Sequence, residues 1–300
     1  MSEPQTGILA PGPALGRYLF LNLAPDEDPR DARDALLELE LDDDIVVGIG
    51  NSLVLAWKST IEGLKAFPSL TGPGVEIPST QTALWIWLRS DTDRGELIHR
   101  SLELEQLLDP ALEMALIVDS FKHDPTPEGR GRDLSGYEDG TENPTGEDAV
   151  AAAIVSGLSA GLDGSSFVAV QKWQHDLVGL QSLTDSERDD MIGRRLEDNE
   201  ELEDAPESAH VKRTAQESFK PEAFVVRQSM PWFDRDGEGL MFVAFGRTLD
   251  AFETQLIRMT GREDGIVDGL FRFSKPVSGG YYWCPGVEDD KLNLSALLGA

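Results

Sequence analysis

Apolar positions recur along the chain with a period of about two residues in some segments and about 3.6 in others, which separates predicted strands from predicted helices. In the first half, the expected strands are 18–23, 45–50, 83–88 and 111–121, and the expected helices are 28–41 and 93–108. A connection rich in proline and glycine, 67–78, follows the second strand. The order of elements in this half is therefore βαββαβ.

The second half repeats this order. Strands are expected at 166–174, 223–230 and 240–245 and within 270–283, and helices at 184–195 and 250–259. The first of these helices opens with the capping pattern Thr184-x-x-Glu187, and the second stops at Gly261. Two such units predict a duplicated ferredoxin-like α+β fold, with helices packed on antiparallel sheets. We place the units at residues 1–133 and 134–300.

Two long polar segments interrupt this pattern. Residues 125–146 join the two units through a charged, glycine-rich stretch, and residues 197–218 interrupt the second unit. Long loops on a rigid scaffold often carry binding or catalytic residues. Candidate chemistry is therefore expected first in these two segments.

Charge and composition narrow the class of protein. Acidic residues outnumber basic ones by 55 to 26, and the formal net charge of −29 argues against binding to nucleic acid or to anionic membrane surfaces. No apolar run is long enough to span a bilayer and the N-terminus does not look like a secretory signal, so a cytoplasmic protein is expected. The single cysteine, Cys284, excludes an intramolecular disulfide.

The segment 136–144 reads GYEDGTENP and places Asp139 beside turn-forming glycines. Glycines let the backbone fold closely around a ligand, which favours a functional loop. Asp-Gly and Asn-Pro are also routine turn formers, so an ordinary surface turn remains open at this point.

His210 differs from the other histidines of the chain, which are His99, His123 and His175. It lies in the second polar segment next to Lys212 and Arg213, where basic residues cluster in an otherwise acidic chain. A histidine beside two cations suits a cofactor that carries carboxylates. An exposed basic loop is the alternative.

Arg227 falls in the middle of the expected strand 223–230, on the same face as Val225 and Ser229. An arginine in such a position needs an anion. Arg247, which follows the strand 240–245, competes for this role, although its position before a helix also suits capping or surface roles.

Several motifs now stand in a fixed order: GYEDG at 136–140 followed by TENP, IGR at 192–194, SAHVKRT at 208–214, VRQSMP at 226–231 and DGxxD at 264–268. Together they resemble the dye-decolourising haem peroxidases, in their compact bacterial form called class B. The resemblance covers nearly the whole chain. The family's duplicated ferredoxin-like fold agrees with the repeat described above.

The resemblance implies a set of roles. His210 would be the axial ligand of haem b, and Asp268 would accept a hydrogen bond from its other ring nitrogen. Asp139 would carry the proton during peroxide cleavage, and Arg227 would stabilise the developing negative charge. Asn143 and Ser229 would support this pocket, although some relatives have asparagine where this chain has Ser229.

Further residues are implied at the edge of the cofactor. Arg194, together with Lys212 or Arg213, would meet the haem propionates or line the access path. The resemblance further implies that the protein reduces hydrogen peroxide and oxidises dyes, phenols or other bulky aromatic reductants in one-electron steps through a ferryl intermediate. A homo-oligomer is expected, and a role as nanocompartment cargo would follow if the segment 292–298 were a docking peptide rather than a terminal helix.

Two other functions are kept open. The chain could be a haem carrier or a related haem enzyme such as chlorite dismutase, which would not need Asp139 and Arg227 together. It could also be a cofactor-free structural oligomer, since a fold alone does not fix a function. Aromatic residues that could relay electrons include Trp173, Trp232, Tyr281, Tyr282 and Trp283, but strand aromatics usually belong to the core, and none is assigned a redox role.

Overall fold

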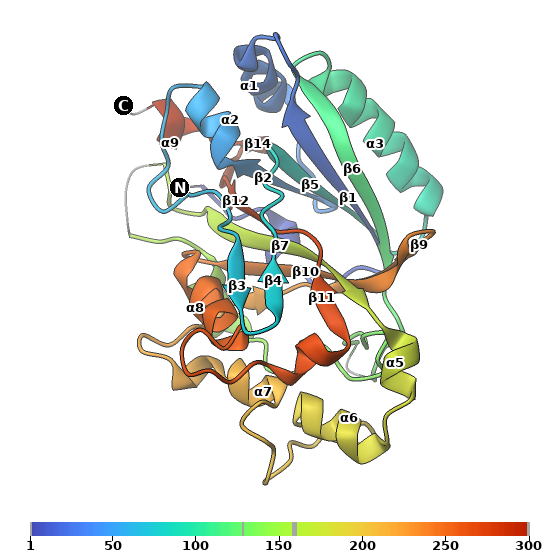
Figure 1. Ribbon diagram of the computed structural model, residues 1–300. Helices are drawn as coiled ribbons and strands as arrows, with labels where there is room; N and C mark the ends of the chain where they lie inside the picture. The colour runs from blue at the N-terminus through green and yellow to red at the C-terminus, as the bar shows by residue number, and fades with distance from the viewer. Residues whose placement is uncertain (1, 128, 158–160, 299–300) are drawn as a thin grey trace.

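Ten strands form one antiparallel sheet in the computed structural model, which describes residues 2–127, 129–157 and 161–298 (Figure 1). These strands are β1 Leu15–Leu23, β2 Ile45–Gly50, β5 Leu84–Ser90, β6 Leu112–Phe121, β7 Ser166–His175, β8 Val226–Arg227, β9 Met230–Asp234, β10 Gly237–Gly246, β11 Ser274–Pro276 and β12 Gly280–Cys284. Two small hairpins lie apart from it, β3 Leu70–Gly72 with β4 Val75–Ile77, and β13 Val287–Glu288 with β14 Lys291–Leu292.

Strand pairing reveals the duplication. In the first half the strands lie side by side as β2-β5-β1-β6, and in the second as β12-β7-β10 with β8 and β9 beyond β10. Both halves therefore have the order expected of a βαββαβ unit, which confirms the duplicated ferredoxin-like fold. The halves also pair with each other, because β12 pairs with β2 and β9 with β6. The unit boundary at residues 133 and 134 stays a prediction.

Side chains alternate between the two faces of the sheet along each strand, and the buried residues form two separate clusters. In β5, Trp85 and Trp87 face one buried cluster, whereas Leu84, Ile86 and Leu88 face the other. The first cluster is rich in aromatic rings enclosed between strands of both halves. The second lies under the helices and includes the buried faces of α1 and α3. A buried core on both faces explains why these strands read as almost continuous apolar runs.

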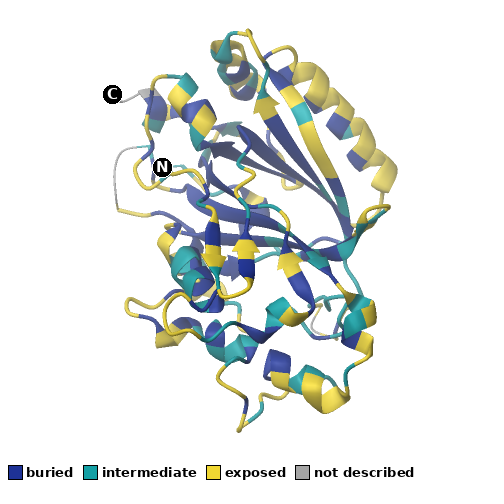
Figure 2. Cartoon of the chain, viewed as in Figure 1, coloured by how far each residue is buried: buried dark blue, intermediate teal, exposed yellow. Residues whose placement is uncertain are grey.

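The helices are α1 Pro29–Glu38, α2 Asn51–Ala56, α3 Arg94–Leu108, α4 Gly146–Ala153, α5 Leu177–Gln181, α6 Asp185–Ile192, α7 His210–Arg213, α8 Asp250–Met259 and α9 Ser295–Leu298. Three 3₁₀ turns accompany them among the described residues, η1 Thr6–Ile8, η2 Gln216–Ser218 and η3 Gly269–Arg272. Figure 1 shows α1 and α3 over the first half, with α5, α6, α7 and α8 gathered below the second half. Figure 2 shows that the outer side of α3 is exposed whereas the strands are largely buried.

Several sequence expectations hold closely. The helix 250–259 is confirmed with its predicted bounds, and Thr184 and Glu187 form the complete capping box. The helix expected at 28–41 ends earlier, at Glu38, because Leu39 already has extended backbone. The hairpin β3–β4 and the helices α2 and α4 were not predicted, because such short elements have too few residues to establish a period.

The strand expected at 223–230 is wrong in its bounds. Of the residues 223–230, only Val226, Arg227 and Met230 belong to strands, β8 and β9, which both pair with β10 in one common register. Before β8, the backbone N–H groups of Ala223 and Val225 donate to Gln216 instead of to a strand. Tertiary hydrogen bonds therefore replace the first ladder bonds.

Within the described segments, no helix combines the length and apolar character needed to cross a membrane.

Candidate active site

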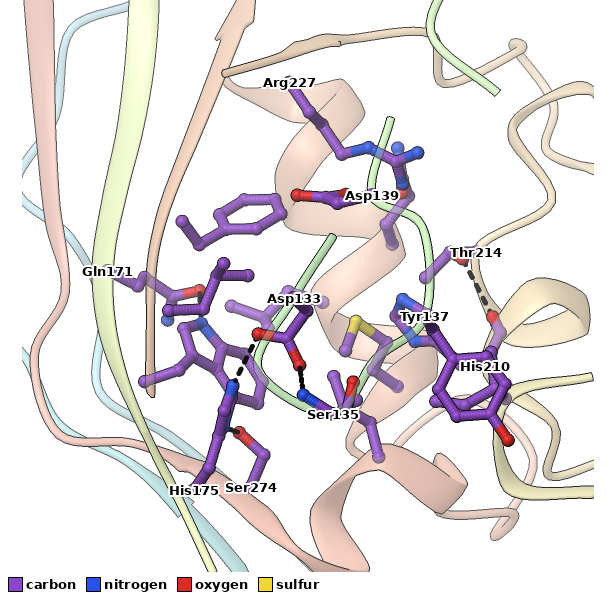
Figure 3. A pocket seen from close by; sticks show the side chains of 18 of the residues that line it. Asp133, Ser135, Tyr137, Asp139, Gln171, His175, His210, Thr214, Arg227 and Ser274 are labelled. Carbon is purple, nitrogen blue, oxygen red and sulfur yellow. Dashed lines mark hydrogen bonds and ion pairs between the residues drawn. The ribbon is translucent and has the colours of Figure 1, made fainter. Parts of the chain in front are cut away.

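A cavity opens between β7, β8, β10, α7, α8 and the loop that follows β6. Its apolar walls come from Trp173, Ile192, Leu240, Phe242, Phe252, Leu256, Met259 and Leu270. Polar groups enter at separate places, among them Asp139, Arg227 and His210 (Figure 3). A large apolar cavity with a few convergent polar groups is the usual form of a cofactor site.

His210 is the first residue of α7 and lines this cavity. Its Nδ1 lies 2.9 Å from Oδ2 of Asp268, whose side chain is fully buried. Because an ionised carboxylate only accepts, Nδ1 donates, and Nε2 carries the free lone pair. Nε2 has no hydrogen-bond partner among the described residues. The imidazole is therefore arranged as a metal ligand.

Asp268 is itself held in place. Its Oδ1 accepts the backbone N–H of Leu270 at 2.8 Å, which caps η3. The next residue, Gly269, donates its N–H to the carbonyl of Ser208 at 2.7 Å. A Cβ at Gly269 would come within 2.9 Å of a backbone oxygen of Met191, so this close approach requires glycine. The DGxxD segment thus fixes the orientation of the His210 ring.

Arg213, predicted at the edge of the cofactor, is bound by other protein groups in the structure. Its guanidinium makes two hydrogen bonds to Asp264, at 2.7 and 2.8 Å, and one to the carbonyl of Arg258. The hydrogen bond from Arg213 lowers the pKa of the Asp264 carboxyl. Arg213 is buried and does not line the cavity, so the expected contact with a cofactor is not supported. Lys212 points to Glu207 instead, and it too lies outside the cavity wall.

Asp139 and Arg227 lie next to each other at another wall of the cavity (Figure 3). The loop that carries Asp139 turns at Gly136 and Gly140, whose φ angles of 96° and 79° favour glycine. The backbone N–H of Asp139 is fixed to the carbonyl of Gly131 at 3.1 Å. Nε of Arg227 is buried without a hydrogen-bond partner in the described part of the chain, which leaves this cation available for an anionic ligand.

Asn143 makes hydrogen bonds to both backbone groups of Arg227. Its Nδ2 donates to the Arg227 carbonyl at 2.7 Å, and its Oδ1 accepts the Arg227 N–H at 2.9 Å. Ser229 lines an adjoining pocket that it shares with Asp139 and Arg227, and its Oγ is buried with no partner in the described residues. Asn143 therefore ties the backbone of Arg227 to the loop that carries Asp139.

Arg194 lies at the edge of the site. It lines a second adjoining pocket together with His210 and Arg227, but not the main cavity. Its guanidinium binds Glu142 and Glu201 and the carbonyl of Asn199. Its charge is therefore already shared between two carboxylates.

Sequence reasoning missed a buried chain of polar groups in the cavity wall. His175 Nε2 lies 3.0 Å from Oδ1 of Asp133, and its Nδ1 lies 2.7 Å from Oγ of Ser274 (Figure 3). Burial alone would raise the pKa of the Asp133 carboxyl, but His175 and hydrogen bonds from Ser135 hold it below its ordinary value. Only the position of His175 at the end of a strand hinted at this cluster, since its partners are far away in sequence.

Asp133→Asn is expected to lower the free energy of unfolding by roughly 2 kcal/mol near neutral pH, because it removes the carboxylate that is hydrogen-bonded to the buried His175. The folded-state pKa of Asp133 is depressed, so its stabilising effect is present above the ordinary aspartate pKa and is lost as the pH falls through the lower folded value. Urea unfolding of both proteins across this pH range measures the difference. A gap that does not narrow toward acid would contradict this assignment.

The donor set of the cavity fits a haem. In the described residues no three His, Cys, Asp or Glu side chains gather to hold a bare metal ion. One imidazole with a free Nε2 instead suits a metal whose remaining ligands come from a macrocycle. The apolar walls suit the faces of such a ring, and the unpaired Nε of Arg227 suits an anion near it.

Comparison with known proteins leads to one family. The model of the Dyp-type peroxidase C-terminal region matches residues 130–289. A dye-decolorizing peroxidase from Mycobacterium tuberculosis is 32% identical over 257 residues, covering 81% of this chain and 73% of that protein. One from Rhodococcus erythropolis is 32% identical over 252 residues, covering 80% and 71%.

Solved structures agree along almost the whole chain. A putative dyp-type peroxidase from Shewanella oneidensis superposes with a TM-score of 0.85 at 28% identity, covering 100% of this chain and 99% of that one. A DypB variant from Rhodococcus jostii, solved in complex with heme, gives a TM-score of 0.84 at 26% identity, with 94% and 96% covered. The chain therefore belongs to the Dyp-type peroxidase family and is a haem-dependent, dye-decolourising peroxidase.

Proposed function

We propose that His210 would hold the haem iron through Nε2 and that Asp268 orients its ring. The hydrogen bond from Nδ1 to the buried Asp268 carboxylate supports this role, because it aims Nε2 into the cavity and makes the imidazole a stronger electron donor. Arg213 supports the ligand at a distance, by holding the last residue of α7 to the segment that carries Asp264. It is not part of the cofactor contact.

Asp139 and Arg227 act on the peroxide. Haem, when bound, would supply the iron whose redox chemistry reduces peroxide. Asp139 would take the proton from one peroxide oxygen and return it to the other, which would leave as water. Arg227 would stabilise the negative charge that develops on the leaving oxygen. Asp139 and Arg227 lie next to each other in the cavity wall, which supports these two roles.

Asn143 and Ser229 keep this pair in place. Asn143 does so through both backbone groups of Arg227. Ser229 offers a buried hydroxyl that is free to bind peroxide or an ordered water beside Asp139. Arg194 is less suited to bind the haem propionates, because its charge is already paired with Glu142 and Glu201.

The observation that carries the proposal is the free Nε2 of His210 in a cavity whose other wall presents Asp139 with Arg227. The test is the visible absorption spectrum of the haem-loaded protein before and after one equivalent of hydrogen peroxide. A histidine-ligated ferric spectrum that changes on peroxide addition is the expected result. A bound haem that peroxide leaves unchanged would favour a carrier, and absence of binding would remove the proposed site altogether.

We further propose that the reductant is a bulky aromatic molecule and that the protein acts as a homo-oligomer in the cytoplasm. Exposed apolar side chains on α3 and β6, namely Ile98, Leu102, Leu107, Leu116 and Ile117, support self-association. Light scattering measures the mass of the protein in solution and so tests whether it forms a homo-oligomer. A role as nanocompartment cargo stays a prediction, and residues 292–298 offer few exposed apolar side chains for docking, because Leu292, Leu294 and Leu297 are buried against the core.

A further inference from the structure

Tyr137 combines two features that its position in the GYEDG loop does not explain. It lines the cavity, and it is only 5% exposed. Its hydroxyl donates a 2.6 Å hydrogen bond to Oδ1 of Asp189, on α6. Figure 3 shows the ring at the cavity and the hydroxyl directed away from Asp139 and Arg227. Tyr137 therefore joins the cavity to a carboxylate outside it.

None of the other tyrosines shares this arrangement, although all four lie in the described residues. Tyr282 binds the hydroxyl of Thr82 at 2.7 Å, and Tyr18 and Tyr281 have no carboxylate partner. None of these three lines the cavity. Trp173 does line it, but its indole N–H points to the amide oxygen of Gln171, which is not a base.

The carboxylate matters because a phenol gives up its proton when it gives up an electron. In a buried site the proton needs an acceptor already in hydrogen-bond contact. Burial, together with the hydrogen bond to Asp189, raises the pKa of Tyr137, so the resting side chain stays a neutral phenol. Asp189 is half-buried and also accepts the backbone N–H of Leu196 at 3.0 Å, which fixes its position.

We propose that Tyr137 and Asp189 form a proton-coupled electron relay between the cavity and the reductant. This step rests on the proposed function: once peroxide has been reduced in the haem-loaded protein, Tyr137 would pass one electron into the cavity while its phenolic proton moves along the existing hydrogen bond to Asp189. The result is a neutral phenoxyl radical beside a carboxylic acid. A bulky aromatic reductant then returns one electron to Tyr137, and Asp189 returns the proton, which restores both groups.

Freeze-quench electron paramagnetic resonance tests this relay on the full chain loaded with haem and mixed with one equivalent of hydrogen peroxide. The wild-type protein is expected to give a radical signal that narrows when the tyrosine rings are deuterated. Tyr137→Phe, which keeps the buried ring, is expected to lose that signal. Tyr281→Phe, at a tyrosine without a carboxylate, is the matched control and is expected to keep it.

Asp189 is a positioning and proton-accepting residue, and its variants separate these two effects. Asp189→Asn keeps a hydrogen-bond acceptor without a base, so radical formation should slow by roughly 100-fold, and Asp189→Glu should restore most of the rate. The visible change on peroxide addition is read in parallel, so failure of the peroxide reaction is recognised separately. A tyrosyl signal that survives in Tyr137→Phe, a wild-type protein that reacts with peroxide but gives no tyrosyl signal, or a wild-type rate in Asp189→Asn overturns the proposal.

Discussion

His210→Ala is expected to lose the histidine-ligated haem spectrum and, with it, the reaction with hydrogen peroxide. Among the residues that the structure describes, His175 is the only other histidine that lines the cavity, and both of its ring nitrogens are hydrogen-bonded, so it is not expected to replace this ligand. The substitution also leaves Asp268 buried without the ring that it orients. Added imidazole is expected to restore part of the spectrum, because the cavity keeps its shape while one ligand is missing.

The matched control is His99→Ala, at an exposed position on α3, which should bind haem as the wild-type protein does. Asp268→Asn gives an intermediate case, with an expected loss of about 10- to 100-fold in haem affinity or activity through the orientation of His210. Titration of each protein with haem, followed by absorbance, measures these differences. An unchanged spectrum in His210→Ala would mean that the iron has another ligand.

Asp139→Asn is expected to slow the reaction with hydrogen peroxide by about 10²- to 10⁴-fold, because the amide cannot accept and return the proton. The resting haem spectrum should stay as in the wild type, since Asp139 and His210 occupy separate walls of the cavity. Arg227→Met should slow the same step by about 10²- to 10³-fold through the loss of a charge that stabilises the leaving oxygen. Stopped-flow absorbance at increasing peroxide concentration measures both rates.

Asp190→Asn provides the matched control, because this aspartate is exposed on α6 and lies outside the cavity wall. It should react with peroxide at the wild-type rate. If Asp139→Asn also reacts at that rate, another group moves the proton. The buried hydroxyl of Ser229, with an ordered water, would then be the next candidate.

Much of the fold follows from local pattern. The period of the apolar residues predicted the strands that became β2 and β7 and the helix that became α8, because each is long enough to bury one regular face. The predicted strand bounds were wrong where backbone N–H groups donate to residues outside the strand, as those of Ala223 and Val225 do. Short elements such as α2 and the hairpin β3–β4 carry too little periodic information to be predicted.

The sequence by itself determined the duplicated fold and the candidates His210, Asp139 and Arg227, because periodicity and ordered motifs are properties of neighbouring residues. Only the tertiary structure decided which candidates meet. It turned Arg213 toward Asp264 and away from the cavity, and it brought Asp133 to His175 and Tyr137 to Asp189. These partners lie dozens of residues apart, and a buried charge or hydroxyl takes whichever partner the packed chain brings within hydrogen-bond distance.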